Sequence, residues 1–499
     1  MRGKSVALCF SIITTLLTLA PRSEAIPAFA RQYGTSCATC HVDFPKLNDF
    51  GKAFKDAGFK FPKNDEEFIK IPPVMLGAPA QKESFPHSIW PGTIPGLPQI
   101  GLRFNTFFQV YSKNRNNFNP PEDGGPFTPR TDFQPGLFSI FTAGNFGDGI
   151  AFWVDDDISV GGSNGNGGLG DGYLKFVNFG RIFKLPKDAL GLRVGQFEID
   201  LPFSPARSWN LSGWDIYDEA NFGAASGLGI GDVNNAFAFS TPGQGVELSG
   251  GHNYGGYHYS LALINQNTSP NGPPGAGGNV SPIVGTFSDS NFKDLYGRFQ
   301  YRFNLEKDAA SRNEIQAAGQ NGPRDHTYLQ FGTYYFYGRS VQRVTGEDGP
   351  LTAREPFYRA GGDFSFNYRT FNLFGLFMYG HDRSQLLDST GTHLISAPSA
   401  HFSGGFLEAD YLALPWLMTI MRYDRVQSTA DFLTSNNFFA PASSTRNRFT
   451  PGVQFLIHAN IKASFEYQIR PPQAGFDSNG NPVPQQRTNQ AVAGLEWVY

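Results

Sequence analysis

Ile461-Lys462-Ala463-Ser464-Phe465-Glu466-Tyr467-Gln468-Ile469-Arg470 is the stretch that decides the fold of this chain. Every odd position carries an apolar side chain and every even position a polar one. Because successive side chains of a strand point to opposite faces, this alternation predicts a strand with one apolar and one polar face. The same pattern recurs in Asp363–Arg369, and the last strand repeats it with Ala491, Ala493, Leu495, Trp497 and Tyr499 on one face.

The long region from Leu97 to Tyr499 is built largely of such segments. The whole chain contains 58 Gly, 48 Phe and 20 Tyr, and only 17% of its residues are charged. Strands of about ten residues are long enough to cross a bilayer when tilted, and no run of about 18 apolar residues follows residue 25. Soluble β-sandwiches also alternate, so the pattern alone leaves both classes open.

Two observations favour a transmembrane barrel. Aromatic residues such as Tyr423, Tyr467 and Trp497 lie near predicted strand ends, where they suit an interfacial girdle. The connections also alternate between tight turns and long polar loops, which is typical of outer-membrane barrels. We therefore predict a mainly β fold, a transmembrane antiparallel β-barrel of about 16 strands with 18 as the alternative, preceded by a small α-helical segment.

The connections predict the orientation of the barrel. Tight turns are expected at Asn145–Gly149, Asn253–Gly256, Thr370–Asn372, Ala413–Trp416 and His458–Asn460. Long polar loops are expected near Lys113–Asp132, Leu201–Asp232, Gln266–Ser290, Ser340–Ala353, Arg383–Ala400, Gln427–Thr445 and Pro471–Thr488. We expect the long loops to face outward and both termini to lie in the periplasm.

The strand count contains one conflict. We find about seventeen candidates, whereas bacterial barrels have even numbers. Either Leu201–Asp232 hides a further strand, or Ala236–Ser240 and Val246–Ser249 are not two separate strands. Glu306–Gln320 is the one insertion with a helical pattern, and we place it at a periplasmic connection.

Residues 1–25 read as a secretory signal peptide. Arg2 and Lys4 form its charged start, Val6–Ala20 its apolar stretch, and Ser23-Glu24-Ala25 a small-x-small cleavage site. The apolar run is too short for a membrane anchor. Cleavage removes three basic residues and one acidic residue, leaving 37 basic and 42 acidic residues and a net charge of −5. This mild acidity argues against a nucleic-acid partner.

Cys37-Ala38-Thr39-Cys40-His41 is the motif that carries chemistry. C-x-x-C-H attaches a c-type haem, because two thiols must reach two vinyl groups on one porphyrin edge and the following imidazole must bind the iron. A thioredoxin-like C-x-x-C or half of a zinc site are the alternatives. Cys9 leaves with the signal peptide, so Cys37 and Cys40 are the only cysteines after export. The motif predicts one covalently bound haem c and a role in electron transfer.

We divide the mature chain into a monohaem cytochrome c segment (26–72), a proline-rich connector (73–96) and an outer-membrane β-barrel (97–499). A helix is expected over Pro45–Ala57, with Gly58 as its C-terminal cap. Fewer than about 50 residues bury a macrocycle poorly, so we expect the segment to dock into the mouth of the barrel. Four aromatic side chains are candidates to pack on the porphyrin: Phe29, Phe44, Phe59 and Phe61.

The second axial ligand of the iron has two candidates, and both lie in the connector. Met75 would raise the potential relative to a second histidine, which His87 would supply. Each has an ordinary alternative, since Met75 suits plain apolar packing and His87 suits a solvated loop. His458, in the barrel, shares its alternation phase with Lys462 and is expected to face the lumen.

The organisation of the mature chain resembles that of a known family. Pro27-Ala28-Phe29-Ala30-Arg31-Gln32 leads into the C-x-x-C-H motif and a porin-like region, as in the fused outer-membrane cytochrome–porins of iron-oxidising bacteria. The specific resemblance is confined to Pro27–His41. It implies thioether attachment at Cys37 and Cys40, with His41 as the proximal ligand. It also implies electron flow from extracellular ferrous iron to a periplasmic c-type cytochrome, in a protein surrounded by outer-membrane lipid.

Three functions stay open at this point. The first is an electron conduit across the outer membrane, with the haem segment on the periplasmic side or in the barrel lumen. The second is a diffusion porin with a haem-bearing plug or sensor, and the third is a haem peroxidase-like enzyme. We expect an electron carrier rather than a turnover enzyme. Asp155-Asp156-Asp157 could bind a cation such as ferrous iron, although a polar lumen edge explains it as well.

Overall fold

The computed structural model describes residues between Ala28 and Val498. Outside the described residues lie 1–27, 87–92, 95–99, 112–129, 160–167, 222–238, 266–291, 306–326, 430–443, 477–481 and some shorter gaps. The expected signal peptide and the helical pattern of Glu306–Gln320 therefore fall outside the described part of the chain.

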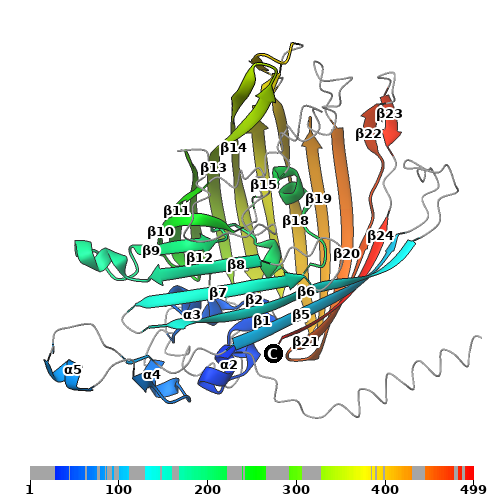
Figure 1. Ribbon diagram of the computed structural model, residues 1–499. Helices are drawn as coiled ribbons and strands as arrows, with labels where there is room; N and C mark the ends of the chain where they lie inside the picture. The colour runs from blue at the N-terminus through cyan, green and yellow to red at the C-terminus, as the bar shows by residue number, and fades with distance from the viewer. Residues whose placement is uncertain are drawn as a thin grey trace, which may run out of the picture.

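Sixteen antiparallel strands close into one barrel, which confirms the predicted fold and the count of sixteen (Figure 1). Each strand pairs with the next barrel strand along the chain, and the last pairs with the first through contacts such as Gln490 with Tyr111. The strands are β5 (Ile100–Tyr111), β6 (Arg130–Asn145), β7 (Ile150–Ser159), β8 (Gly168–Phe176), β9 (Gly191–Phe197), β10 (Gly243–Gly251), β11 (Gly256–Asn265), β12 (Lys293–Asn304), β13 (Tyr328–Gly346), β14 (Gly349–Tyr368), β15 (Phe371–Asp382), β18 (Ala400–Leu414), β19 (Leu417–Ser428), β20 (Ser444–His458), β21 (Ile461–Gln468) and β24 (Gln490–Val498).

The two faces of the wall have opposite character. In β19, Arg422 and Asp424 are 1% and 0% exposed inside the barrel, whereas Met421 and Tyr423 are 46% and 40% exposed outside it. The stretch Ile461–Arg470 shows the same difference, because Ser464 is buried in the lumen while Phe465 is exposed outward. A polar interior inside an apolar exterior is the arrangement of transmembrane barrels and the reverse of a soluble core.

The five tight turns expected from the sequence lie at one end of the barrel. They join β6 to β7, β10 to β11, β14 to β15, β18 to β19 and β20 to β21. At the opposite end some long connections continue as paired strands. Residues 340–353, expected as a loop, form the outer part of the β13–β14 hairpin, where Arg343 pairs with Thr352. The short hairpins β16 (Gln385–Leu387)–β17 (Leu394–Ser396) and β22 (Gln473–Phe476)–β23 (Pro482–Gln485) also lie at this end.

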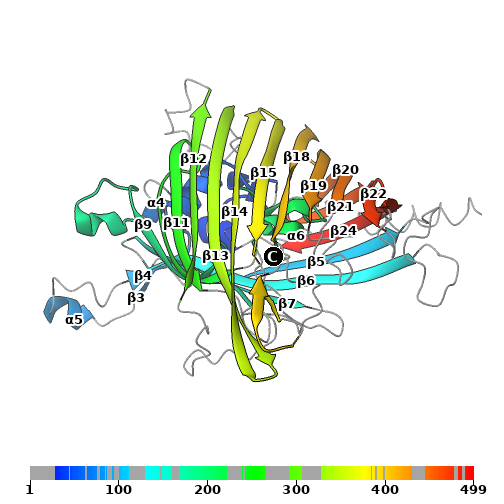
Figure 2. The same ribbon diagram turned by 90° about the horizontal axis from the view of Figure 1, so that it is seen from above.

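One connection folds inward instead of outward, which corrects our expectation for Leu201–Asp232. Its described part, which includes η3 (Pro205–Arg207) and α6 (Asp215–Asn221), crosses the lumen (Figure 2). Trp214 is 2% exposed; its indole N–H donates to Glu408 at 2.9 Å, and its ring stacks on Phe406 at 4.6 Å. This segment is buried because its apolar side chains find aromatic partners on the far wall. In the part of this region that the structure describes, β10 is the one barrel strand, which favours a single strand near Val246.

The segment before the barrel consists of short elements. They are α2 (Ala28–Tyr33), η1 (Cys37–Thr39), β1 (His41–Asp43), β2 (Lys46–Leu47), α3 (Asp49–Asp56) and α4 (Asp65–Phe68). The connector holds β3 (Val74–Met75), α5 (Pro79–Ser84) and β4 (Thr93–Ile94), with β3 paired to β4. Among the described residues, no helix is long and apolar enough to span a membrane.

Protease added to intact cells is expected to cut at the end of the barrel that carries the long connections. The target is the β16–β17 region, where Arg383 is exposed, and the spared site is the Asn253–Gly256 turn. The orientation follows from the rule that outer-membrane barrels have short periplasmic turns. Immunoblotting of the fragments against tags at each terminus locates the cut. Cleavage at Asn253–Gly256 before the β16–β17 region would reverse the orientation.

Candidate functional site

The Cys37–His41 motif forms one tight turn. Cys37–Thr39 is a 3₁₀ helix, η1, and the Cys40 backbone N–H donates to the Cys37 carbonyl oxygen at 3.2 Å. Side chains three residues apart eclipse each other in this conformation, so both thiols lie on one face of the turn. Neither cysteine is in a disulfide. The turn therefore presents two free thiols side by side, directly before His41.

Asn48 clamps this turn to helix α3. Its side-chain amide donates to the carbonyl oxygens of Ala38 and Thr39, both at 3.1 Å, and its Oδ1 accepts the Gly51 backbone N–H at 2.9 Å. Its own N–H donates to the Cys40 carbonyl oxygen at 3.0 Å. Because Asn48 caps the helix, α3 begins at Asp49 and not at the expected Pro45. Turn and helix thus form a single unit.

Two glycines allow the close packing of α3. A Cβ on Gly51 would lie 2.1 Å from the Cys40 carbonyl oxygen, so the helix approaches the motif as closely as only glycine permits. Gly58 follows the helix with φ of +78°, which confirms its expected capping role. A Cβ there would meet Val177 of the barrel at 2.7 Å. Both ends of α3 therefore tolerate no side chain.

The environment keeps the donor groups of the motif neutral. Burial raises the pKa of the Cys40 thiol to about 12, with a smaller contribution from Cys37. Burial also lowers the pKa of His41 to about 4, although two backbone groups oppose the shift. At neutral pH the imidazole is therefore uncharged, and an uncharged imidazole is the form that binds a metal.

The part of the chain that carries the motif, residues 28–68, is called the motif segment. It lies inside the barrel at the end with the tight turns (Figure 2), which confirms the predicted docking. The Arg302 guanidinium of β12 donates to both carboxylate oxygens of Asp49 at 2.7 Å. The Lys46 ammonium donates to Asn372 at 2.7 Å and pairs with Asp410 at 3.6 Å. Charged contacts to several separate strands therefore fix the segment in the lumen.

Aromatic side chains form the core of the segment. Phe29 packs edge-on against Phe54 at 5.0 Å, and Tyr33 stacks on Phe61 at 4.3 Å. Phe59 extends this core to the barrel, because its ring lies 5.6 Å from that of Trp153 in β7. Of the four aromatics expected to pack on a porphyrin, Phe29, Phe59 and Phe61 join this cluster, and Phe44 lies outside the described residues.

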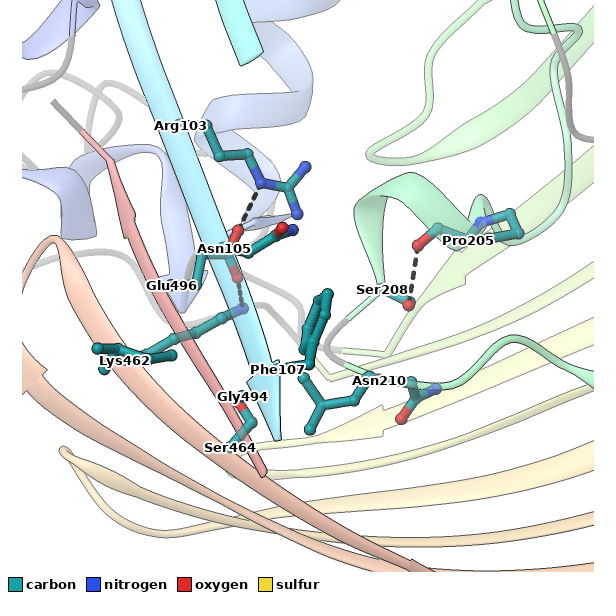
Figure 3. A pocket seen from close by; sticks show the side chains of 12 residues that line it. Arg103, Asn105, Phe107, Pro205, Ser208, Asn210, Lys462, Ser464, Gly494 and Glu496 are labelled. Atoms are coloured by element: carbon teal, nitrogen blue, oxygen red, sulfur yellow. Dashed lines mark hydrogen bonds and ion pairs between the residues drawn. The ribbon is translucent and has the colours of Figure 1, made fainter. Parts of the chain in front are cut away.

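A cavity lies between the inward connection and the wall formed by β21, β24 and β5 (Figure 3). Arg31 ties α2 to the Ile100 carbonyl oxygen at the start of β5, and Val42 packs against Met418 and Ile420 of β19. The motif between them faces the arc of wall from β19 to β5. In this arc the Lys462 ammonium pairs with Glu496 at 3.0 Å, and Glu496 also pairs with Arg103 at 2.5 Å. The lining comes from Arg103, Asn105, Phe107, Pro205, Ser208, Asn210, Leu211, Lys462, Ser464, Gly494, Leu495 and Glu496.

A second cavity lies where α3 meets the β8–β11 wall. Lys55 of α3 borders it, and burial, with Arg207 as the next cause, lowers the pKa of Lys55 to about 7. On the opposite side Arg193 pairs with Glu247 at 2.5 Å. Charged side chains are prominent in the lining of this cavity, together with apolar ones such as Phe59 and Ile199.

The candidates for the second axial ligand are not brought to His41 in the described residues. Met75 is 59% exposed in β3, which lies outside the ring of strands in Figure 2. His87 lies outside the described residues. Both stay predictions. His458 is exposed at the β20–β21 turn.

The chemistry of the donor set fits a haem c. Two protonated thiols share one face of a turn, and a neutral imidazole follows them directly. Within the part of the chain that the structure describes, no group of three or more His, Cys, Asp and Glu side chains is placed to hold a metal ion. Asp155 of the triple-aspartate run accepts the backbone N–H of Asp171.

Sequence reasoning missed the partners that hold the motif. Asn48 stands directly before an amphipathic run, so its capping role had a local signal. The pair of Asp49 and Arg302 had none, because 253 positions separate the two residues. The same holds for Trp214 and Glu408, which are 194 positions apart.

Comparison with known proteins gives distant matches. No family model and no curated protein matches this chain, so the resemblance to cytochrome–porins stays a prediction. Among solved structures, Pseudomonas putida OprB is 11% identical, with 81% of this chain and 94% of that chain covered and a TM-score of 0.48. The anion-selective porin from Comamonas acidovorans is 12% identical, with 80% and 98% covered and a TM-score of 0.45. Salmonella typhi OmpF is 9% identical, with 81% and 98% covered and a TM-score of 0.44. At this distance the likeness carries no information about function.

Proposed function

We propose that this protein is a bacterial outer-membrane β-barrel that holds one covalent haem c in its lumen and conducts electrons across that membrane. The observation that carries the proposal is the Cys37–His41 turn, clamped by Asn48 inside a closed barrel. When bound, a haem with an axial histidine supplies one-electron redox chemistry.

The outward faces of the strands support the membrane placement. Large apolar side chains such as Leu263, Phe299 and Phe377 are about half exposed on this surface. A soluble monomer rarely exposes a continuous apolar surface of this kind. Outer-membrane lipid would cover it, while buried ion pairs such as Arg298 with Asp363 remain inside the lumen.

Each residue of the motif would have a separate role in binding the haem. Cys37 and Cys40 would form the two thioether bonds, and His41 would bind the iron as the proximal ligand. Asn48 fixes the turn that carries both thiols. The barrel wall and the aromatic cluster limit the access of water, and burial and the nearby charges of the protein set the potential of such a site.

We infer the two electron partners from the resemblance of the Pro27–His41 region. The donor is extracellular ferrous iron at the end of the barrel with long connections. The acceptor is a c-type cytochrome in the periplasm, at the end where the motif segment lies.

The packing of the lumen fits a barrel that holds a plug, which is a feature of the electron conduit and of the alternative, a diffusion porin with a haem-bearing plug or sensor. Tyr296, Tyr334 and Phe336 point into the barrel but are only 0–3% exposed. Tyr217 and Phe239, from the inward connection, pack among them. In the described part of the barrel, the middle of the lumen is therefore filled by side chains.

The function is tested in liposomes that hold the haem-loaded protein in their membrane and oxidised mitochondrial cytochrome c inside. Ferrous iron added outside is expected to reduce the trapped cytochrome, as followed by its absorbance. The variant with Cys37 and Cys40 both changed to Ala is the control, because it keeps the barrel and cannot attach haem.

The comparison of the two proteins separates the candidate functions. An electron conduit reduces the cytochrome only when haem is attached. A diffusion porin lets ferrous iron enter, so both proteins would give the same rate. Equal rates would contradict the proposal.

A further inference from the structure

We propose that the connection between β8 and β9 is a membrane anchor that inserts its apolar side chains among the phospholipid headgroups beside the barrel. This connection, residues 177–190, is far longer than the five tight turns at the same end of the barrel. The inference goes beyond the proposed electron transfer and depends only on the barrel lying in a membrane.

The connection is a built structure. It contains the 3₁₀ helix η2 (Phe179–Phe183), and the Gly180 N–H donates to the Leu190 carbonyl oxygen at 2.9 Å. The Leu185 N–H returns to the Gly180 carbonyl oxygen at 3.0 Å, and Asn178 Oδ1 accepts the Asp188 N–H at 3.1 Å. The side chains on its surface are therefore held there by the backbone.

These surface side chains are apolar to an unusual degree. Ile182 is 71% exposed and Phe183 is 61% exposed, and Leu185 is exposed beside them. We call this connection, residues 177–190, the knob. Burying such side chains away from water is favourable, so their exposure indicates that another surface covers the knob.

The charges of the knob indicate what covers it. Arg181, Lys184 and Lys187 are all exposed, and no acidic residue occurs from Gly172 to Lys187. Basic side chains beside apolar ones suit an anionic lipid surface, where the stem lies along the apolar region and the charge reaches the headgroups.

The position of the knob selects lipid as the occupant. Leu174 of β8 and Val194 of β9 are exposed on the outer face of the strands that lead into it and out of it. The apolar surface of the knob therefore continues the surface assigned to lipid. In both views the teal helix of this connection projects from the side of the barrel (Figures 1 and 2).

The test measures the contact with lipid directly. The full-length variant Ile182→Trp is placed in bilayers that contain brominated phosphatidylcholine and phosphatidylglycerol, which quench tryptophan fluorescence on contact. Leu263→Trp, on the outer face of β11, is the lipid-facing control. Ile395→Trp, an exposed residue in β17, is the control that faces water. The signal of the unmodified protein is subtracted from each.

We expect the Ile182→Trp signal to be quenched like that of Leu263→Trp and more than that of Ile395→Trp. Quenching should fall when brominated phosphatidylglycerol is replaced by brominated phosphatidylcholine. Changing Arg181, Lys184 and Lys187 to Gln should remove this dependence.

Quenching no stronger than that of Ile395→Trp would overturn the inference and leave the knob to a protein partner. Loss of quenching in Leu263→Trp would instead contradict the membrane placement of the barrel, so the two failures are distinguishable.

Discussion

Changing both Cys37 and Cys40 to alanine is expected to remove the proposed covalent haem completely, seen as loss of peroxidase-type haem staining in a denaturing gel. The sequence contains one other cysteine, Cys9, which lies in the expected signal peptide, so no other thiol of the expected mature chain can form a thioether bond. The barrel itself keeps its stability, because neither thiol contacts the wall through a hydrogen bond or a disulfide among the described interactions.

The matched control is Ala38→Ser. Ala38 lies between the two cysteines and its side chain is exposed, so this variant keeps the motif and should stain like the unmodified protein. Staining that persists in the double variant would refute the assignment of the motif.

Changing Arg302 to methionine should release the motif segment from the barrel. Arg302 is buried and donates two hydrogen bonds to Asp49, so its loss removes the charged link between α3 and β12, while Lys52 of the same helix stays 3.3 Å from the Asp49 carboxylate. Removing one member of a buried pair costs about 3–5 kcal/mol, which corresponds to an increase of roughly 10²- to 4 × 10³-fold in the undocked form. Methionine keeps much of the packing of the arginine on Tyr328, whose ring lies 3.6 Å away.

The measurement is limited proteolysis of the folded protein in detergent, with an antibody against a tag before Ala28. Arg302→Met should release the segment early, while the barrel still migrates as a folded band in an unheated gel. Adding Asp49→Asn to the same chain should restore much of the protection, because the buried charge is then absent. Equal protection of the Arg302→Met variant and the unmodified protein would show that the pair does not hold the segment.

The barrel could be predicted from the sequence because the alternation of apolar and polar residues is a local pattern. The alternation in Ile461–Arg470 and Asp363–Arg369 follows from each residue facing either lipid or lumen, and no distant partner is needed to see it. The end of α3 was readable for the same reason, since Gly58 supplies a positive φ at the cap. Its start was missed although Asn48 is a typical N-cap residue, and the hydrogen bonds from Asn48 to the carbonyl groups of the preceding turn were visible only in the structure.

The segments that fill the lumen, and the residues that hold them there, could not be predicted from the sequence. The connection around Trp214 looks like other long loops, and its inward course depends on Glu408, Phe406 and Glu466 in strands far along the chain. The docking of the motif segment was predicted from its size, whereas the residues that fix it, Asp49 and Arg302, became visible only when the strands were placed. Contacts between residues that are far apart in the sequence produce no periodic pattern from which they could be predicted.

The closure of the barrel through β5 and β24 has a consequence for biogenesis. This seam joins the first and last strands of the barrel, as in the pairing of Phe108 with Ala493, so the ring is complete only when the last strand has joined it. Once it is closed, Cys40 lies beneath α3 inside a continuous wall. If Cys40 carries haem as proposed, the enzyme that joins haem to this thiol would therefore have to act before the barrel closes. The order of the sequence would provide the interval, because the motif precedes the last strand by more than 400 residues.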